Sequence, residues 1–178
     1  MSSIIRFGFL YGLALVISFY LSHVLLGTSP DNFTKGEIVG YSVMLISSLA
    51  VVMGIKEFKG NTAPTPLSFL AGFNVGLGIS LIAASIFAAY NWVYLEFINP
   101  EFTATYIQYS EQQIRSSGLD PLSMEQQLEE LAHYGELMSS HLTQSAVMFA
   151  TVFIIGLLFS VVSAIAFRTS EKPATTHT

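Results

Sequence analysis

The stretch Leu67–Leu95, LSFLAGFNVGLGISLIAASIFAAYNWVYL, contains no aspartate, glutamate, lysine or arginine. An α-helix rises about 1.5 Å per residue, so roughly 20 residues cross the hydrocarbon core of a bilayer. Lipid offers no hydrogen-bonding partner to backbone N–H and C=O groups, and such a segment must therefore be helical. The stretch predicts a transmembrane helix that is longer than needed and tilts or protrudes.

Three further apolar runs lie on either side of this one, at residues 7–26, 38–55 and 142–167. The composition agrees with them, because only 11% of the 178 residues are charged, against roughly 25% in ordinary soluble domains. The sequence predicts an all-α integral membrane protein, a bundle of four transmembrane helices in a single domain at residues 1–168. The polar end, residues 169–178, is predicted to be a disordered cytoplasmic tail.

The first apolar run has an alternative interpretation as a cleaved signal peptide. Its apolar core of about 20 residues exceeds the usual length of roughly 7–15. We therefore expect it to be retained as the first span.

Basic residues near the ends of the spans predict how the chain is threaded, since lysine and arginine favour the cytoplasmic face. One side holds the N-terminus, residues 56–66 and the C-terminal tail, with five basic and two acidic residues. The other side holds residues 27–37 and 96–141, with two basic and ten acidic residues. Lys56 and Lys59 are thus interpreted as a topology signal, with a binding patch for acidic lipid or protein as the alternative. Both termini are predicted to be cytoplasmic, in the inner membrane of a bacterium.

Several motifs occur along the chain in a fixed order. They are Tyr41–Ser47, Gly-Ile-Lys-Glu-Phe at 54–58, the glycine-rich stretch at 69–77 and Phe-Ile-Asn-Pro-Glu-Phe at 97–102. Together they resemble the bacterial membrane-protein family known as domain of unknown function 4199, over nearly the whole chain. The resemblance implies a four-span inner-membrane architecture with a long extracytoplasmic segment, and it implies no activity.

Small residues recur at four-residue spacing in the runs, which allows helix backbones to approach closely. These residues are Gly8 with Gly12, Gly36 with Gly40, Gly72 with Gly76, and Gly156 with Ser160 and Ala164. They predict interhelical packing within one bundle, or a homodimer seam as the alternative. Asn74 is expected to hydrogen-bond to another helix, because an unpaired amide is costly in lipid; a pore or ligand contact is its alternative role.

Other polar and aromatic residues of the runs lie toward the predicted outer ends. His23, Asn91 and Glu96 are placed where water or headgroups can satisfy them. The aromatic residues there are expected to form an interfacial belt; they are Tyr90, Trp92, Tyr94 and Phe97. No acid or base lies at mid-membrane, which argues against a proton-coupled transporter.

Residues 100–141 predict an extracytoplasmic helical hairpin between the third and fourth spans. Pro100 is expected to open its first helix, with Phe102, Tyr106 and Tyr109 on one face. The second helix is expected to start at a capping box at residues 123–126, and no proline stops it from continuing into the fourth span. Its apolar seam comprises Met124, Leu128, Leu131, Gly135, Met138 and Leu142. We expect the two apolar stripes to face each other, or, if exposed, to bind a partner.

The second hairpin helix also carries an acidic face formed by Glu125, Glu129, His133 and Glu136. Such spacing suits a divalent metal, but the first helix offers few facing ligands, and a solvated face is expected. We predict no metal, cofactor or catalytic site. The chain has no cysteine, no nucleotide-binding or hydrolase motif, and a net charge of −5 that argues against nucleic acid.

Two classes of function are consistent with these features. The first is a non-enzymatic membrane scaffold or interaction subunit, whose hairpin meets a membrane protein, an extracytoplasmic protein or a second copy. The second is a small transporter, channel or membrane enzyme that uses Asn74 or the acidic face. The second class requires a water-filled cavity between the spans.

Overall fold

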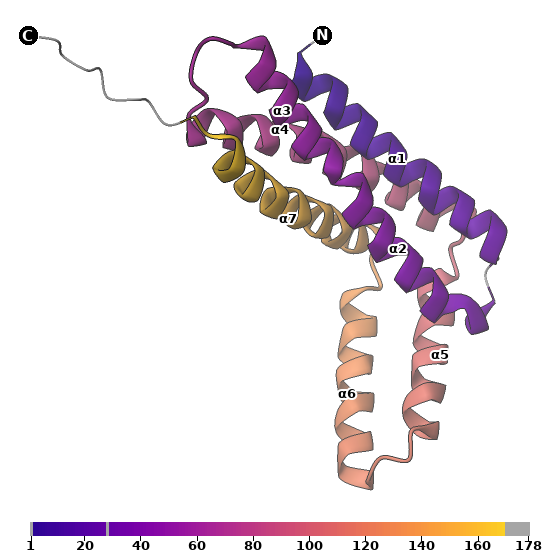
Figure 1. Ribbon diagram of the computed structural model, residues 1–178. Helices are drawn as coiled ribbons and strands as arrows, with labels where there is room; N and C mark the ends of the chain where they lie inside the picture. The colour runs from indigo at the N-terminus through magenta and orange to yellow at the C-terminus, as the bar shows by residue number, and fades with distance from the viewer. Residues whose placement is uncertain (1, 28, 170–178) are drawn as a thin grey trace, which may run out of the picture.

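The computed structural model describes residues 2–27 and 29–169, which are helical with no strand (Figure 1). Four described segments are long and apolar enough to cross a membrane. They are α1 (Ser3–Leu26), α2 (Phe33–Ser47) joined to α3 (Leu49–Asn61), α4 (Phe69–Val93) and α7 (His141–Phe167). The predicted all-α fold with four spans is confirmed. Apart from Thr169, the predicted tail lies outside the described residues; the Thr169 amide donates to the Leu67 carbonyl at 2.9 Å.

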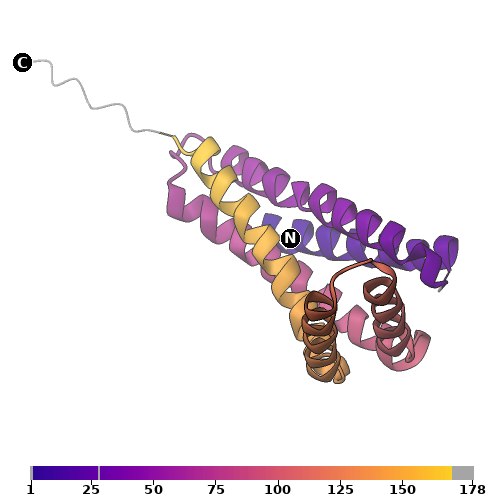
Figure 2. The same ribbon diagram turned by 90° about the horizontal axis from the view of Figure 1, so that it is seen from below.

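Helix α4 is the centre of the bundle and packs mainly against α7 and α1, while α3 contacts all three. The start of α1 and the end of α7 lie at the same end of the bundle, called here the terminal end (Figure 1). Helices α5 (Phe102–Ser116) and α6 (Pro121–Leu137) lie side by side beyond the opposite end, called the hairpin end. Figures 1 and 2 show this pair turned away from the axis of the bundle.

The second span is one long rod with an interruption at Ser48. The Ser48 side chain is fully buried, and its hydroxyl donates to the Leu45 carbonyl at 2.6 Å. A serine bonded back to its own helix commonly bends that helix. Sequence reasoning placed residues 56–66 in the connection between the second and third spans. In the structure α3 runs to Asn61, so residues 54–60 form its last two turns.

A close contact joins α4 to α7 through small residues on both helices. A Cβ atom on Gly76 would lie 2.6 Å from the Ser160 Cβ, and a Cβ atom on Gly156 would lie 2.6 Å from the Ser80 Cβ. The two serine hydroxyls are fully buried and donate within their own helices, Ser80 to the Gly76 carbonyl and Ser160 to the Gly156 carbonyl. Each serine therefore acts as a small residue whose polar group is already satisfied.

Glycines also fit α1 and α3 against α4. A Cβ on Gly8 would meet Ile82 at 2.8 Å, and one on Gly12 would meet Ile86 at 2.9 Å. Gly54, inside the Gly-Ile-Lys motif, lies directly against Ile79. The motif thus has a packing role that sequence reasoning missed.

Asn74 does not form the expected bond to another helix. Its side chain is exposed, and it makes no side-chain hydrogen bond in the described part of the chain. Gly72 and Gly76 fix the face of α4 that meets α7, and Asn74 lies two positions from each. Two residues turn a helix by about 200°, so Asn74 points away from that contact.

Replacing Gly156 with alanine should lower the free energy of unfolding by about 1–3 kcal/mol, because the new methyl group has no space beside Ser80. Detergent titration of the purified protein, followed by circular dichroism, measures this loss. Gly60→Ala is the matched control, since its Cβ would meet nothing within 4 Å. Adding Ser80→Gly to Gly156→Ala should restore part of the stability. Equal losses in Gly156→Ala and Gly60→Ala would contradict the packing described.

Candidate functional site

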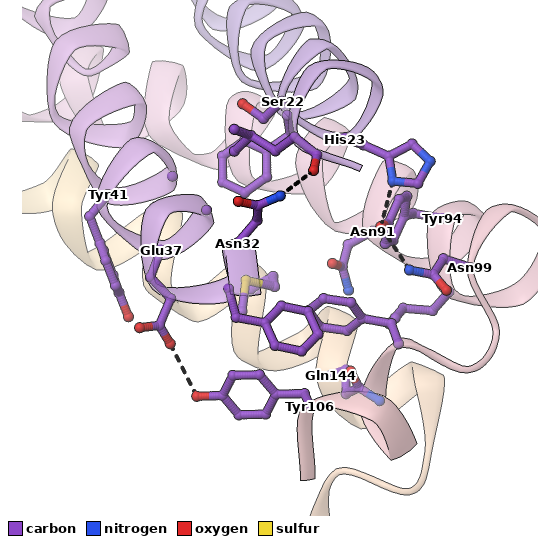
Figure 3. A pocket seen from close by; sticks show the side chains of 18 of the residues that line it. Ser22, His23, Asn32, Glu37, Tyr41, Asn91, Tyr94, Asn99, Tyr106 and Gln144 are labelled. Atoms are coloured by element: carbon purple, nitrogen blue, oxygen red, sulfur yellow. Dashed lines mark hydrogen bonds between the residues drawn. The ribbon is translucent and has the colours of Figure 1, made fainter. Parts of the chain in front are cut away.

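A partly open cavity of about 450 Å³ lies at the hairpin end of the bundle (Figure 3). It forms because α2 packs on α1 but touches α7 only slightly, which leaves a space beside α4 and α7. The cavity is lined by α1, α2, α4 and α7, and it is covered by residues of α5 and α6. Its volume falls in the range of roughly 300–1,000 Å³ that is typical of small-molecule sites.

The hairpin is fixed over this cavity by an aromatic cluster around Phe33. The Phe33 ring makes edge contacts with Phe102, Tyr106 and Tyr109, with ring centroids 5.8, 5.6 and 5.3 Å away. The expectation that these three residues face the second hairpin helix is wrong. They instead join α5 to the start of α2.

Helix α6 packs on a different side of α5. Ile107 of α5 lies beside Gly135, where a Cβ would be 3.4 Å from the Ile107 side chain. The predicted seam residues Met124, Leu128, Leu131 and Gly135 are half-buried, and Met138 is buried. Leu142 is 72% exposed and lies outside the seam.

The ends of the hairpin helices differ from the sequence-based expectation. Helix α5 begins at Phe102 and not at Pro100. Helix α6 begins at Pro121, because the Asp120 carboxylate accepts the amides of Leu122 and Ser123 at 3.1 Å. Hydrogen bonds from Ser123, its side chain first, lower the pKa of Asp120. The capping box expected at residues 123–126 is therefore not used.

Helix α6 does not continue into the fourth span. It ends at Leu137, and α7 begins at His141, where the Ser140 hydroxyl accepts the Thr143 amide at 3.4 Å. The Gln144 amide bridges the break, donating to the Met138 carbonyl at 2.6 Å and to the Thr103 hydroxyl at 2.8 Å. This side chain connects the hairpin to α7 and also lines the cavity.

Polar residues expected to meet water or headgroups bond to other helices instead. His23 Nδ1 lies 3.0 Å from the Tyr94 hydroxyl, which accepts from Asn99 at 3.1 Å. Asn91 donates to Ser145 at 3.3 Å, and Glu96 lies 2.8 Å from His141. Tyr94 opens a π-helical turn, Tyr94–Ile98, that extends α4 and that sequence reasoning did not predict.

The predicted aromatic belt is divided between two environments. Trp92 and Phe97 are exposed, as an interfacial belt requires. Tyr90 and Tyr94 are half-buried and line the cavity. Phenylalanine and tyrosine rings thus form a substantial part of the cavity lining.

One carboxylate lies at the edge of this aromatic surface. The Tyr106 hydroxyl donates to Glu37 Oε1 at 3.0 Å, and Figure 3 shows Tyr41 beside Glu37 on the same helix. Burial, and then the hydrogen bond to Glu37, raise the pKa of Tyr106. Burial and the neighbouring Tyr41 and Glu37 raise the pKa of Tyr134. Among the described lining residues Glu37 is the only acid, and none is lysine or arginine.

The other predicted site residues lie away from the cavity. Glu125, Glu129, His133 and Glu136 are exposed on α6, and no group of three potential metal ligands occurs in the described ranges. Lys56 is exposed and Lys59 half-buried near the terminal end of α3. Between them, Glu57 accepts from Ser3 at 2.9 Å and forms an ion pair with Arg6. That contact joins α1 to α3.

A family model with the description "Protein of unknown function (DUF4199)" matches residues 6–169. The chain belongs to this family. The match confirms the resemblance found in the sequence, and it covers all four spans and both hairpin helices. No curated protein and no solved structure matches the chain. Family membership therefore supplies no activity, and the functional argument rests on the geometry of the hairpin and the cavity.

Replacing Phe33 with alanine should loosen the hairpin, because three edge contacts, each worth about 0.5–1.5 kcal/mol, are lost together. Hydrogen exchange should become faster at the amides of α5, while the amides of α4 keep their protection. Phe97→Ala is the matched control, since Phe97 is 70% exposed and its one ring contact is with Trp92. Unchanged exchange in α5 of Phe33→Ala would show that the aromatic cluster does not anchor the hairpin.

Proposed function

We propose that the protein is a non-enzymatic membrane interaction subunit, which uses α6 to bind a protein partner or a second copy of itself. The observation that carries this proposal is exposed apolar surface at both ends of an anchored helix. Leu122 and Leu137, near the two ends of α6, are 66% and 54% exposed. The cluster at Phe33 and the Gln144 bonds hold the hairpin on the bundle, so these two leucines are presented in a fixed position.

The proposal places the hairpin outside the cytoplasm, in the inner membrane of a bacterium. Arg6, Lys56, Lys59 and Arg168 all belong to the terminal end, which favours a cytoplasmic position for that end. The hairpin end carries most of the acidic residues. Both termini are then cytoplasmic, and α6 projects from the outer face.

The alternative, a transporter, channel or membrane enzyme, has less support. Asn74 is exposed on the side of α4 that faces away from α7, and the acidic face of α6 is exposed to solvent. The cavity supports a binding role at the hairpin end, yet below it α4 and α7 close together at Ser80 and Gly156. In this closed half the Tyr11 hydroxyl is the single buried side-chain polar atom without a partner among the described residues. A transport path would need more polar groups than this.

Photocrosslinking from α6 in cells tests the proposed function. A photoreactive residue at Leu122 or Leu137 should capture one protein reproducibly, either a separate partner or another copy of the chain. The same group at Ile154, which is 55% exposed in the middle of α7, is the matched control and should capture lipid alone. Capture of lipid alone from all three positions would contradict an interaction role for α6.

A further inference from the structure

The cavity lining includes residues of α2 and α7 that are also exposed on the surface of the bundle. Tyr41 of α2 and Val147 of α7 both line the cavity, and they are 61% and 37% exposed. Helices α2 and α7 touch only slightly. A hydrocarbon chain can therefore lie in the gap between them without leaving the membrane.

The hairpin end of the cavity, which α5 and α6 cover, lies at the level where lipid headgroups are expected. Trp92 and Phe97 are exposed at the hairpin end of α4, and exposed aromatic residues at the end of a span favour the membrane–water interface. The contact between Glu96 and His141 lies at the same end of the bundle. A molecule bound here has its polar part beneath α5 and α6 and its apolar part in the hydrocarbon layer.

The lining selects the charge of that polar part. Glu37 shares the cavity lining with Tyr41, Tyr106 and Tyr134, and the Tyr106 hydroxyl donates to it. A carboxylate suits an ammonium group, and a nearby aromatic ring can add a cation–π attraction. The nearest lysine along α2, Lys35, lies outside the lining and donates to Asn32 at 3.4 Å. An anionic headgroup would find no lysine or arginine among the described lining residues.

We propose that the cavity binds a membrane phospholipid with an amine headgroup. Its ammonium group lies against Glu37, and its chains leave through the gap between α2 and α7. The cavity of about 450 Å³ has room for a headgroup and the adjoining part of the chains. The inference rests on the four-span membrane architecture but not on a protein partner for α6. Failure of one experiment thus leaves the other proposal standing.

Native mass spectrometry of the full chain in a mild detergent tests this site. The probes are dioleoyl phosphatidylethanolamine, its N-acetyl derivative, which lacks the positive charge, and dioleoyl phosphatidylglycerol. Phosphatidylethanolamine should bind about tenfold more tightly than either of the other two, the effect expected of one charge-assisted contact. Equal binding of the three lipids, preference for phosphatidylglycerol, or no binding would overturn the proposal. Binding of dodecylamine without binding of phosphatidylethanolamine would overturn the assignment to a bilayer lipid.

Two variants locate the site within the chain. Glu37→Gln keeps an acceptor for Tyr106 but removes the charge, and it should abolish the preference for phosphatidylethanolamine over its N-acetyl derivative. Glu125→Gln, an exposed acid of α6 outside the cavity, is the matched control and should keep the preference. Gly36→Leu fills the cavity from a position where a Cβ meets nothing within 4 Å, and it should weaken binding of all three lipids. An unfolding midpoint like that of the unmodified protein, measured for each variant without lipid, verifies that its fold is intact. Unchanged lipid binding in both Glu37→Gln and Gly36→Leu would overturn the proposed location of the site.

Discussion

The structure depends on the close contact between α4 and α7, because lipid removes the hydrophobic drive that joins helices in water. Gly76 receives Ser160, and Gly156 receives Ser80, so two backbones approach where larger side chains would hold them apart. Both serine hydroxyls donate within their own helices. This pair of helices is a fixed base, and α1 and α3 add to it through further glycine contacts at its terminal half.

The hairpin end is different because α2 packs on α1 but touches α7 only slightly. Gly40 lies against α1, where a Cβ would be 3.2 Å from the Phe19 ring, whereas Gly36 faces open space. The space that remains is surrounded by tyrosines and amides and is covered by α5 and α6. Phe33 connects that cover to the first span pair. The terminal half of the bundle is thus closed, and the hairpin half holds a cavity. Both proposed roles belong to the hairpin end: protein binding to α6, and lipid binding to the cavity.

Sequence reasoning could predict the four spans and the small-residue positions, since both follow from local composition and spacing. It could also have placed Asn74 correctly, because its offset from Gly72 and Gly76 already directs it away from their face. The cavity was beyond such reasoning. Phe33 and Tyr106 are far apart in the chain and share no periodic pattern, and Glu37 looked like one more acid in a polar loop. The start of α6 was misplaced because Asp120 followed by Pro121 is a stronger start signal than the capping box two residues later.

The proposed threading puts the hairpin end of the cavity on the outer side of the membrane, and the contact between α4 and α7 closes the bundle toward the terminal end. The chain contains no cysteine, so single cysteines can be placed at will and treated with a membrane-impermeant maleimide on intact cells. Cysteine at Gly36 in the cavity and at Gly118 in the hairpin loop should react. Cysteine at Ser160 in the α4–α7 contact and at Gly60 at the terminal end should not. Reaction at Gly60, or at Ser160 together with Gly36, would contradict the account.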